Sequence, residues 1–122
     1  MKRDRLCEFL KVKNIPDKKE EFLKKYREKI KDISKSQDFI DDLTKFNALS
    51  NKIRFLIYKL LLENELCTCA LAEIFNVSES TITHHLKILE KAGLIVGIKR
   101  GYFTFYSTKS LLADSLQLKT TK

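Results

Sequence analysis

Residues 65–107 hold the pattern that most constrains how this 122-residue chain can fold. Apolar residues at helical spacing predict a short helix over 68–75, and a polar turn follows it. Ser78 then has the position and the side chain of a helix N-cap, and Gly93 stands where a second helix would need a left-handed C-cap residue. Two helices joined by so short a turn are typical of a helix-turn-helix.

Each of these two helices is expected to bury one face. In the first, the inward residues are Leu71, Ile74 and Phe75; in the second they are Ile82, His85, Leu86 and Leu89. His85 is therefore predicted to be a hydrogen-bonded core histidine, whereas His84 beside it turns outward.

The period of the sequence changes after Gly93. Residues 94–107 are rich in β-branched and aromatic side chains around Lys99-Arg100-Gly101, which predicts two strands and a hairpin turn. A hairpin directly behind a helix-turn-helix is a wing. The predicted fold class is therefore mainly α with a small β-hairpin, a winged helix-turn-helix.

Three further helices are predicted ahead of this motif. Residues 17–35 carry an apolar stripe on a highly charged helix, and 36–50 form a second amphipathic helix. The next helix, 51–62, is apolar nearly all round, which favours a position in the middle of the core. Residues 1–15 show no clear period and are interpreted as an arm, so the predicted domains are an arm at 1–15 and a winged helix-turn-helix domain at 16–122.

The formal charge of +8 favours a polyanionic partner. The sequence has no apolar run long enough to cross a bilayer and no signal-peptide pattern at its N-terminus, so a cytoplasmic protein without a membrane partner is expected. An enzyme is not expected, because no Ser/His/Asp arrangement or Gly-rich phosphate loop is present.

Double-stranded DNA is the expected partner, with the second helix of the motif in the major groove. Its outward side chains are short hydrogen-bonding groups followed by cations, and the wing tip adds further cations. The predicted DNA-binding residues are Ser78, Ser80, Thr81, Thr83, His84, Lys87, Lys91, Lys99, Arg100 and Tyr102. Ser78 and Ser80 could also act only as caps.

Cys67 and Cys69 flank a single residue at the start of the first helix of the motif. The unpaired N–H groups of a helix N-terminus favour a thiolate, and two thiolates so close can bind one soft ion. A disulfide within a Cys-x-Cys pair would be strained. Metal binding, a thiol redox switch and simple burial of the two cysteines all remain open at this point.

The segments FNALSNKIRFLIYKLL, ELCTCALAEIFNVS, STITHHLKILEKAGLI and GIKRGYFTFYS together resemble the ArsR/SmtB family of metal-responsive repressors. The resemblance implies a homodimeric transcriptional repressor that leaves its operator when a metal binds. It also implies that the N- and C-terminal helices pair in the dimer, which would give the helix at 17–35 and Leu111, Leu112 and Leu116 a partner.

The family patterns imply further metal ligands, and this chain departs from them. An arsenic-type box has a third cysteine where this chain has Ala72, and a cadmium- and lead-type arm can have a second one where this chain has Lys11. The zinc-type site on the last helix is expected to be absent, because Asp114 has no histidine near it. The expected metal ligands are therefore Cys7, Cys67 and Cys69, with Cys7 coming from the partner protomer.

Three thiolates suit As(III) and Pb(II), and Cd(II) with a further donor. Such an ion is expected as an effector that folding does not require. A winged-helix regulator with a thiol redox switch, or with no ligand, is the alternative.

Overall fold

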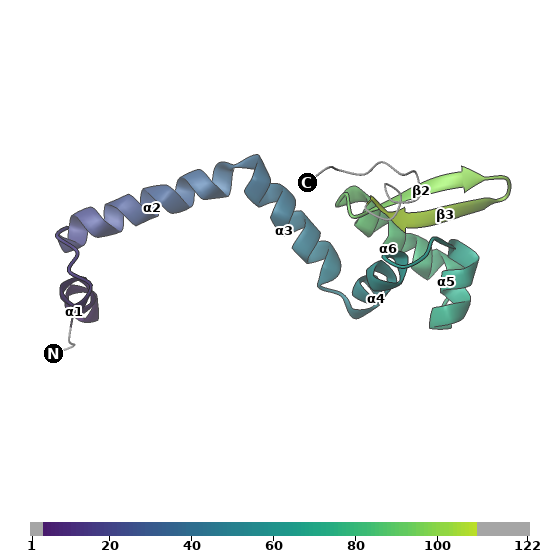
Figure 1. Cartoon of the computed structure of the whole chain (residues 1–122), viewed down its shortest axis with the longest axis horizontal. Coiled ribbons are helices and arrows are strands. Elements are labelled where there is room, and N and C mark those ends of the chain that lie inside the picture. The colour runs from purple at the N-terminus through teal and green to yellow at the C-terminus, as the bar shows by residue number, and fades with distance from the viewer. Residues whose placement is uncertain (1–3, 110–122) are drawn as a thin grey trace. The chain divides into compact units, whose positions relative to one another are not determined.

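A computed structural model of the chain describes residues 4–109. The chain divides into two compact units, Met1–Ile40 and Asp41–Lys122. In chain order the elements are α1 (Arg5–Val12), α2 (Lys19–Lys35), α3 (Gln37–Leu49), α4 (Lys52–Leu61), β1 (Leu66–Cys67), α5 (Thr68–Phe75), α6 (Glu79–Lys91), β2 (Ile95–Arg100) and β3 (Phe103–Thr108) (Figure 1). None of the helices within 4–109 is long and apolar enough to cross a membrane.

The first unit contains a helix where the sequence suggested an arm without a clear period. Asp4 caps α1 by accepting a hydrogen bond from the Cys7 amide at 3.1 Å, and its carboxylate pairs with Lys19 at 2.9 Å. The Phe9 ring lies edge-on to Phe22 of α2, with 6.2 Å between ring centroids. The division into an arm at 1–15 and a domain at 16–122 stays a prediction.

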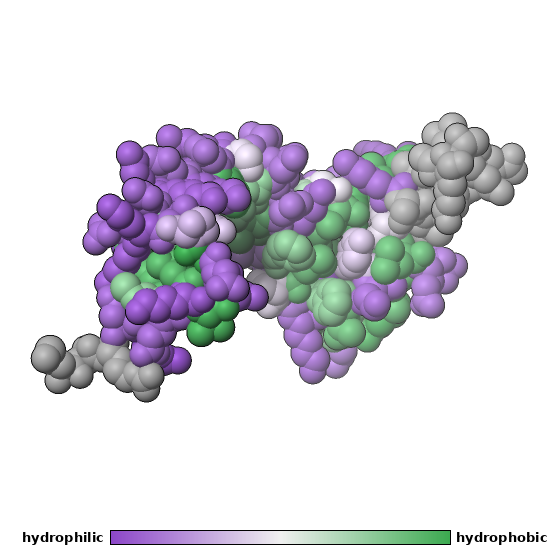
Figure 2. Space-filling view, turned by 60° about the vertical axis from the view of Figure 1, so that its left-hand side comes forward, coloured by the Kyte–Doolittle hydropathy of each residue, from purple (hydrophilic) through white to green (hydrophobic). Residues whose placement is uncertain are grey.

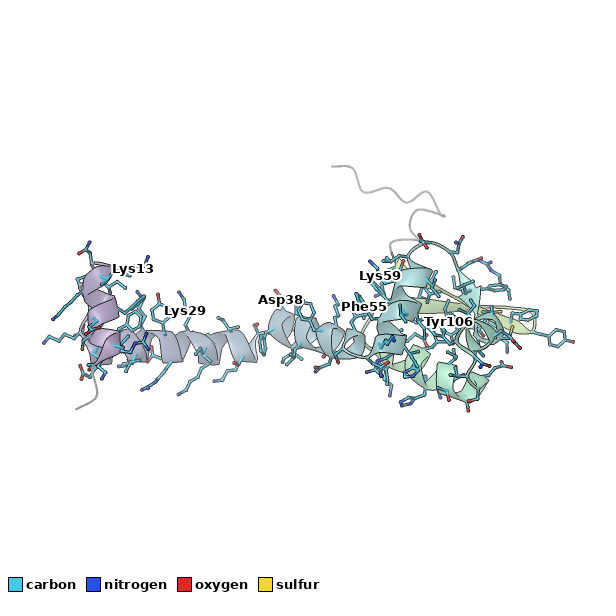
Figure 3. All side chains as sticks on the ribbon, turned by 90° about the horizontal axis from the view of Figure 1, so that it is seen from below. Lys13, Lys29, Asp38, Phe55, Lys59 and Tyr106 are labelled. Atoms are coloured by element: carbon cyan, nitrogen blue, oxygen red, sulfur yellow. The ribbon has the colours of Figure 1, made fainter. Side chains whose placement is uncertain are left out.

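The amphipathic helix predicted over 17–35 is confirmed as α2. Its apolar stripe lies on the surface, because Tyr26, Ile30 and Ile33 are 44%, 62% and 51% exposed and α2 has no buried residue. Lys29 lies on this helix (Figure 3), and its ammonium group lies 5.6 Å from the centre of the Tyr26 ring. The stripe is thus an apolar surface between charged side chains. Figure 2 shows hydrophobic residues in green beside hydrophilic residues in purple.

The second unit is built around side chains from α4, α5 and α6. The fully buried hydrophobic residues there are Ile57, Leu61, Leu71, Ile82, Leu86 and Leu89. The inner face predicted for 78–92 is confirmed, because Ile82, His85, Leu86 and Leu89 are all buried. Helix α5 has the bounds that the sequence predicted, 68–75.

Two predictions of burial are wrong. Helix α4 is not buried all round: Ile57 and Leu61 are buried, whereas Phe55 and Leu56 are 46% and 43% exposed. Ile74, expected to point inward from α5, is 55% exposed. In both helices only one face packs on α6 and the sheet, and additional apolar residues lie on the outer face, where helical periodicity alone does not place them.

The wing is an antiparallel hairpin, as predicted, but its turn lies at Gly101-Tyr102, slightly later than the expected Lys99-Arg100-Gly101. Gly101 has a φ of +63°, a left-handed conformation that glycine adopts without strain. The short strand β1, which was not predicted, pairs antiparallel with β3 and gives the sheet order β1-β3-β2. The sheet therefore joins the start of α5 directly to the wing.

The predicted C-terminal contacts of Leu111, Leu112 and Leu116, and Asp114, lie outside the described residues.

Candidate nucleic-acid interface and thiol site

Helix α6 begins with a cluster of hydroxyl groups. The Ser78 Oγ accepts a hydrogen bond from the Thr81 amide at 3.1 Å and so caps the helix, as predicted. The same oxygen lies 3.0 Å from the Ser80 hydroxyl and 2.8 Å from the Thr81 hydroxyl. These three predicted DNA contacts therefore also stabilise the first turn of the helix.

The outward face of α6 carries the other predicted contacts. Thr83 is half-buried, whereas His84, Lys87 and Lys91 are exposed. A row of hydroxyl, imidazole and ammonium groups on one exposed helix can reach base edges and phosphates. The geometry suits this role, and the individual DNA contacts stay predictions.

The wing presents its predicted contacts unequally. Lys99 is exposed, and Tyr102 at the turn is fully exposed. Arg100 instead turns toward the sheet: its Nη1 lies 2.7 Å from the Glu65 carboxylate, and its guanidinium lies 5.2 Å from the centre of the Phe105 ring. A contact of Arg100 with DNA would therefore compete with the Glu65 ion pair.

His85 connects α6 to α4. It is 8% exposed, and its Nδ1 lies 3.4 Å from the Nη1 of Arg54, whose Nε donates to the Ala48 carbonyl at 2.7 Å. Burial lowers the pKa of His85, and the Arg54 and His84 charges lower it further. The structure thus confirms His85 as a core histidine, and the neutral ring can accept a hydrogen bond from the Arg54 guanidinium at Nδ1.

This lowered pKa predicts a loss of stability in mild acid. The unfolded chain binds a proton at His85 near pH 6.5, whereas the folded chain resists it, so stability falls as the pH drops below about 6.5. Urea unfolding at pH 7.5 and pH 5.5 measures this loss in the wild-type protein and in His85→Gln and His84→Gln variants. We expect His85→Gln to lose part of the pH dependence and His84→Gln to keep it. An equal loss of unfolding free energy between pH 7.5 and pH 5.5 in all three proteins would show that His85 is not the group responsible.

The two cysteines of the motif are brought together at the start of α5. Cys67 is the N-cap residue, and its Sγ lies 2.9 Å from the Sγ of Cys69, with both thiols free. The pKa of Cys67 is lowered, first by the hydrogen bond from the Cys69 thiol and then by the Ala70 amide. The pKa of Cys69 is raised, first by its hydrogen bond with Cys67 and then by burial. When the pair loses one proton, Cys67 is therefore the group that carries the charge.

A hollow of about 400 Å³ opens beside this pair. The start of α5, the start of α6 and the wing turn form its walls, which include Cys67, Cys69, Glu79, Thr83, Phe103 and Thr104. Within residues 4–109 no three His, Cys, Asp or Glu side chains are grouped as metal ligands would be. The chain thus forms a two-thiol site, and Cys7, which belongs to the other unit, stays a predicted third ligand.

Sequence reasoning missed three charged residues of this region, Arg54, Glu65 and Glu79. Arg54 contacts His85, 31 positions away in the chain. Glu65 pairs with Arg100, 35 positions away. No local pattern indicates such pairs. The acidic residue at 79, by contrast, stands in the first turn after the predicted cap, where carboxylates are favoured.

Comparison with known proteins gives consistent matches. Residues 51–96 match the family described as bacterial regulatory protein, arsR family. The cadmium resistance transcriptional regulatory protein CadC homolog of Staphylococcus aureus is 41% identical over 78 residues, 63% of this chain and 64% of that protein. The transcriptional repressor SdpR of Bacillus subtilis is 38% identical over 72 residues, 58% of this chain and 80% of that protein.

The arsenical resistance operon repressor of Bacillus subtilis is 40% identical over 63 residues, 51% of this chain. The match spans 60% of that repressor. In both the arsenical repressor and the cadmium protein, the chain thus covers less than two thirds of the relative's length.

Solved structures agree on the fold. Reduced HlyU from Vibrio cholerae superposes with a TM-score of 0.56 at 25% identity, covering 67% of this chain and 87% of that one. A homodimeric winged helix-turn-helix DNA-binding domain from Mycobacterium bovis gives a TM-score of 0.55 at 23% identity, covering 64% and 76%. With the capped α5–α6 pair and the wing described above, these matches show that the chain belongs to the arsR family of winged helix-turn-helix regulatory proteins.

Proposed function

We propose that this protein is a homodimeric transcriptional repressor that leaves its operator when a soft metal or metalloid binds cysteine thiolates. The observation that carries the proposal is the Cys67–Cys69 pair, 2.9 Å apart at the first residues of the helix-turn-helix. Relatives named for cadmium and arsenical resistance support the choice of effector. Such a regulator acts in the cytoplasm, where thiols stay reduced.

The exposed face of α6 supports DNA binding. In the docked complex α6 lies in the major groove, and Lys99 and Tyr102 on the wing approach the flanking backbone. The +8 charge of the chain adds a favourable long-range attraction to the duplex.

The exposed apolar residues of α2, and separately those of α3, support a dimer. Ile30 and Ile33 on α2, and Leu43 and Phe46 on α3, are 48–69% exposed. Exposed apolar residues that follow one face of a helix are typical of an interface. Two copies of the chain are the proposed occupants, as in the homodimeric relative of known structure.

Three thiolates complete the proposed metal site, with Cys7 of one protomer joining Cys67 and Cys69 of the other. The two described sulfurs fit a soft ion, since sulfurs bound to one ion at about 2.3 Å must lie within about 4.6 Å of each other. As(III) and Pb(II) accept three thiolates, and Cd(II) takes a further donor. The bound ion would link the N-terminal segment to α5.

Release from DNA follows from the position of α5. Leu71 of α5 and Ile82 of α6 are buried in one core, so a change in the angle of α5 moves the recognition helix. A dimer whose two recognition helices no longer match the half-site spacing of about 34 Å loses affinity.

One titration tests the proposed function. The reduced protein on operator DNA is titrated with As(III), Pb(II), Cd(II) and Zn(II), and thiolate-to-metal absorption and DNA release are read together. We expect release with the first three ions and a weaker response to Zn(II), which normally takes four ligands. Hydrogen peroxide is included because paired thiols also suit a redox switch.

Release by peroxide alone would replace the metal effector by an oxidant, and no release by any reagent would contradict the sensor.

Sedimentation of the DNA-free protein at micromolar concentration should give the mass of two chains, and a monomer would contradict the dimer.

A further inference from the structure

We propose that Glu65 lowers the affinity of the protein for DNA, because its carboxylate keeps the Arg100 guanidinium on the sheet and away from a DNA phosphate. The inference rests on the proposed DNA binding and deepens it by naming a side chain that opposes the complex. Glu65 acts through Arg100 and is thus a positioning residue. Its effect belongs to the reduced protein and needs no effector.

The sheet brings the two side chains together across 35 positions of sequence. Glu65 directly precedes β1, whose Cys67 lies opposite Phe105 of β3. Arg100 ends β2 opposite Phe103, which shares a face of β3 with Phe105 because side chains alternate along a strand. Strand pairing therefore places Arg100 beside the start of β1.

Two contacts fix the Arg100 side chain there. Its Nη1 lies 2.7 Å from the Glu65 carboxylate, and its guanidinium lies 5.2 Å from the centre of the Phe105 ring. Lys99, one residue earlier, projects from the opposite face of the strand and is exposed. The wing thus presents the Lys99 charge to solvent, whereas a carboxylate neutralises the Arg100 charge.

The position of Arg100 in the wing suits a phosphate contact. It stands directly before the turn at Gly101-Tyr102, and Tyr102 is fully exposed. A guanidinium can bind a phosphate through two parallel hydrogen bonds, which makes arginine a preferred partner of the DNA backbone. Arg100 would therefore add a phosphate contact next to that of Lys99 if Glu65 did not bind it.

The ion pair is exposed enough to be exchanged. The Arg100 and Glu65 side chains are 53% and 40% exposed, and ion pairs at such exposure are weak and screened by salt. When the wing docks, Arg100 can leave Glu65 for a phosphate, but breaking the pair uses part of the binding free energy. The carboxylate that remains also repels the phosphate. Both effects lower the affinity.

Glu65→Gln tests the inference, with Glu63→Gln as the matched control. Glu63 is exposed, lies two residues earlier and loses the same charge. The probe is a fluorescein-labelled duplex of mixed sequence, because phosphate contacts do not depend on the operator. We expect the Kd of Glu65→Gln to fall about three- to tenfold at low salt, and that of Glu63→Gln to change less than about twofold. The slope of log Kd against log salt should steepen by about two in the dimer of Glu65→Gln.

The same two substitutions in an Arg100→Gln background separate this mechanism from a general effect of charge or of sheet structure. Without Arg100, Glu65→Gln should change the Kd no more than Glu63→Gln does. Thermal melting checks that each variant keeps its fold, as expected for substitutions at exposed positions.

A gain in affinity that persists without Arg100, or equal Kd values for Glu65→Gln and Glu63→Gln, would overturn the inference and leave the proposed DNA binding intact. A fall in affinity in Glu65→Gln would overturn it as well, since Glu65 would then support the complex. A wild-type protein that does not bind the duplex at low salt would instead contradict the proposed function, and the inference with it.

Discussion

Replacing Lys87 by glutamate should weaken operator binding about ten- to hundredfold at low salt. Lys87 is exposed on the outward face of α6. In the proposed homodimer the substitution reverses one positive charge in each protomer. Each lost phosphate contact also removes a released counterion, so the slope of log Kd against log salt should flatten by about two. Fluorescence anisotropy of a labelled operator across a salt series measures both quantities.

Lys59→Glu is the matched control. Lys59 is exposed on α4, where its ammonium group lies 6.0 Å from the centre of the Phe55 ring (Figure 3). The substitution changes the net charge as Lys87→Glu does, but it lies on a helix outside the proposed DNA surface. We expect affinity to fall less than about threefold. If both variants lose affinity equally, net charge rather than α6 governs binding.

The wing offers a less direct test of docking. Arg100→Glu would remove a DNA contact and would also break the 2.7 Å ion pair with Glu65. Because Glu65 directly precedes β1, which pairs with β3, a loss of affinity in that variant would combine a contact effect with a change in the sheet. Lys87 therefore gives the cleaner result.

The helix-turn-helix could be predicted because its signals are local. Ser78 caps α6 through an amide three residues away, and Gly93 ends the helix with a φ of +78°. Such contacts depend on neighbours in the sequence, so residue type and spacing predict them well. The proximity of Cys67 and Cys69 is predictable for the same reason.

The remainder depends on contacts between distant segments. The pairing of β1 with β3 brings Leu66 opposite Tyr106, and a strand of two residues leaves no periodic signal. Helical periodicity likewise did not show that Phe55 and Ile74 lie on outer faces. The third metal ligand is a harder case, because Cys7 lies in a separate unit and its predicted partner is another protomer.

Replacing Cys67 by serine should abolish metal-induced release while DNA binding is retained. Serine is a favoured N-cap residue, so α5 keeps its first turn, but the hard hydroxyl does not replace a thiolate for a soft ion. In the wild type, a coupling of typical size weakens DNA binding about 5- to 150-fold when metal binds. In Cys67→Ser this factor should fall to about one, measured by operator affinity with and without As(III).

Cys7→Ser separates the contribution of the third ligand from that of the pair. We expect its thiolate-to-metal absorption with Pb(II) to fall from a three-thiolate to a two-thiolate level, and its DNA release to be weakened rather than lost, because the 2.9 Å pair still binds the ion. Unchanged absorption would exclude Cys7 from the site. Full release in Cys67→Ser would instead show that the response does not depend on the Cys67–Cys69 pair.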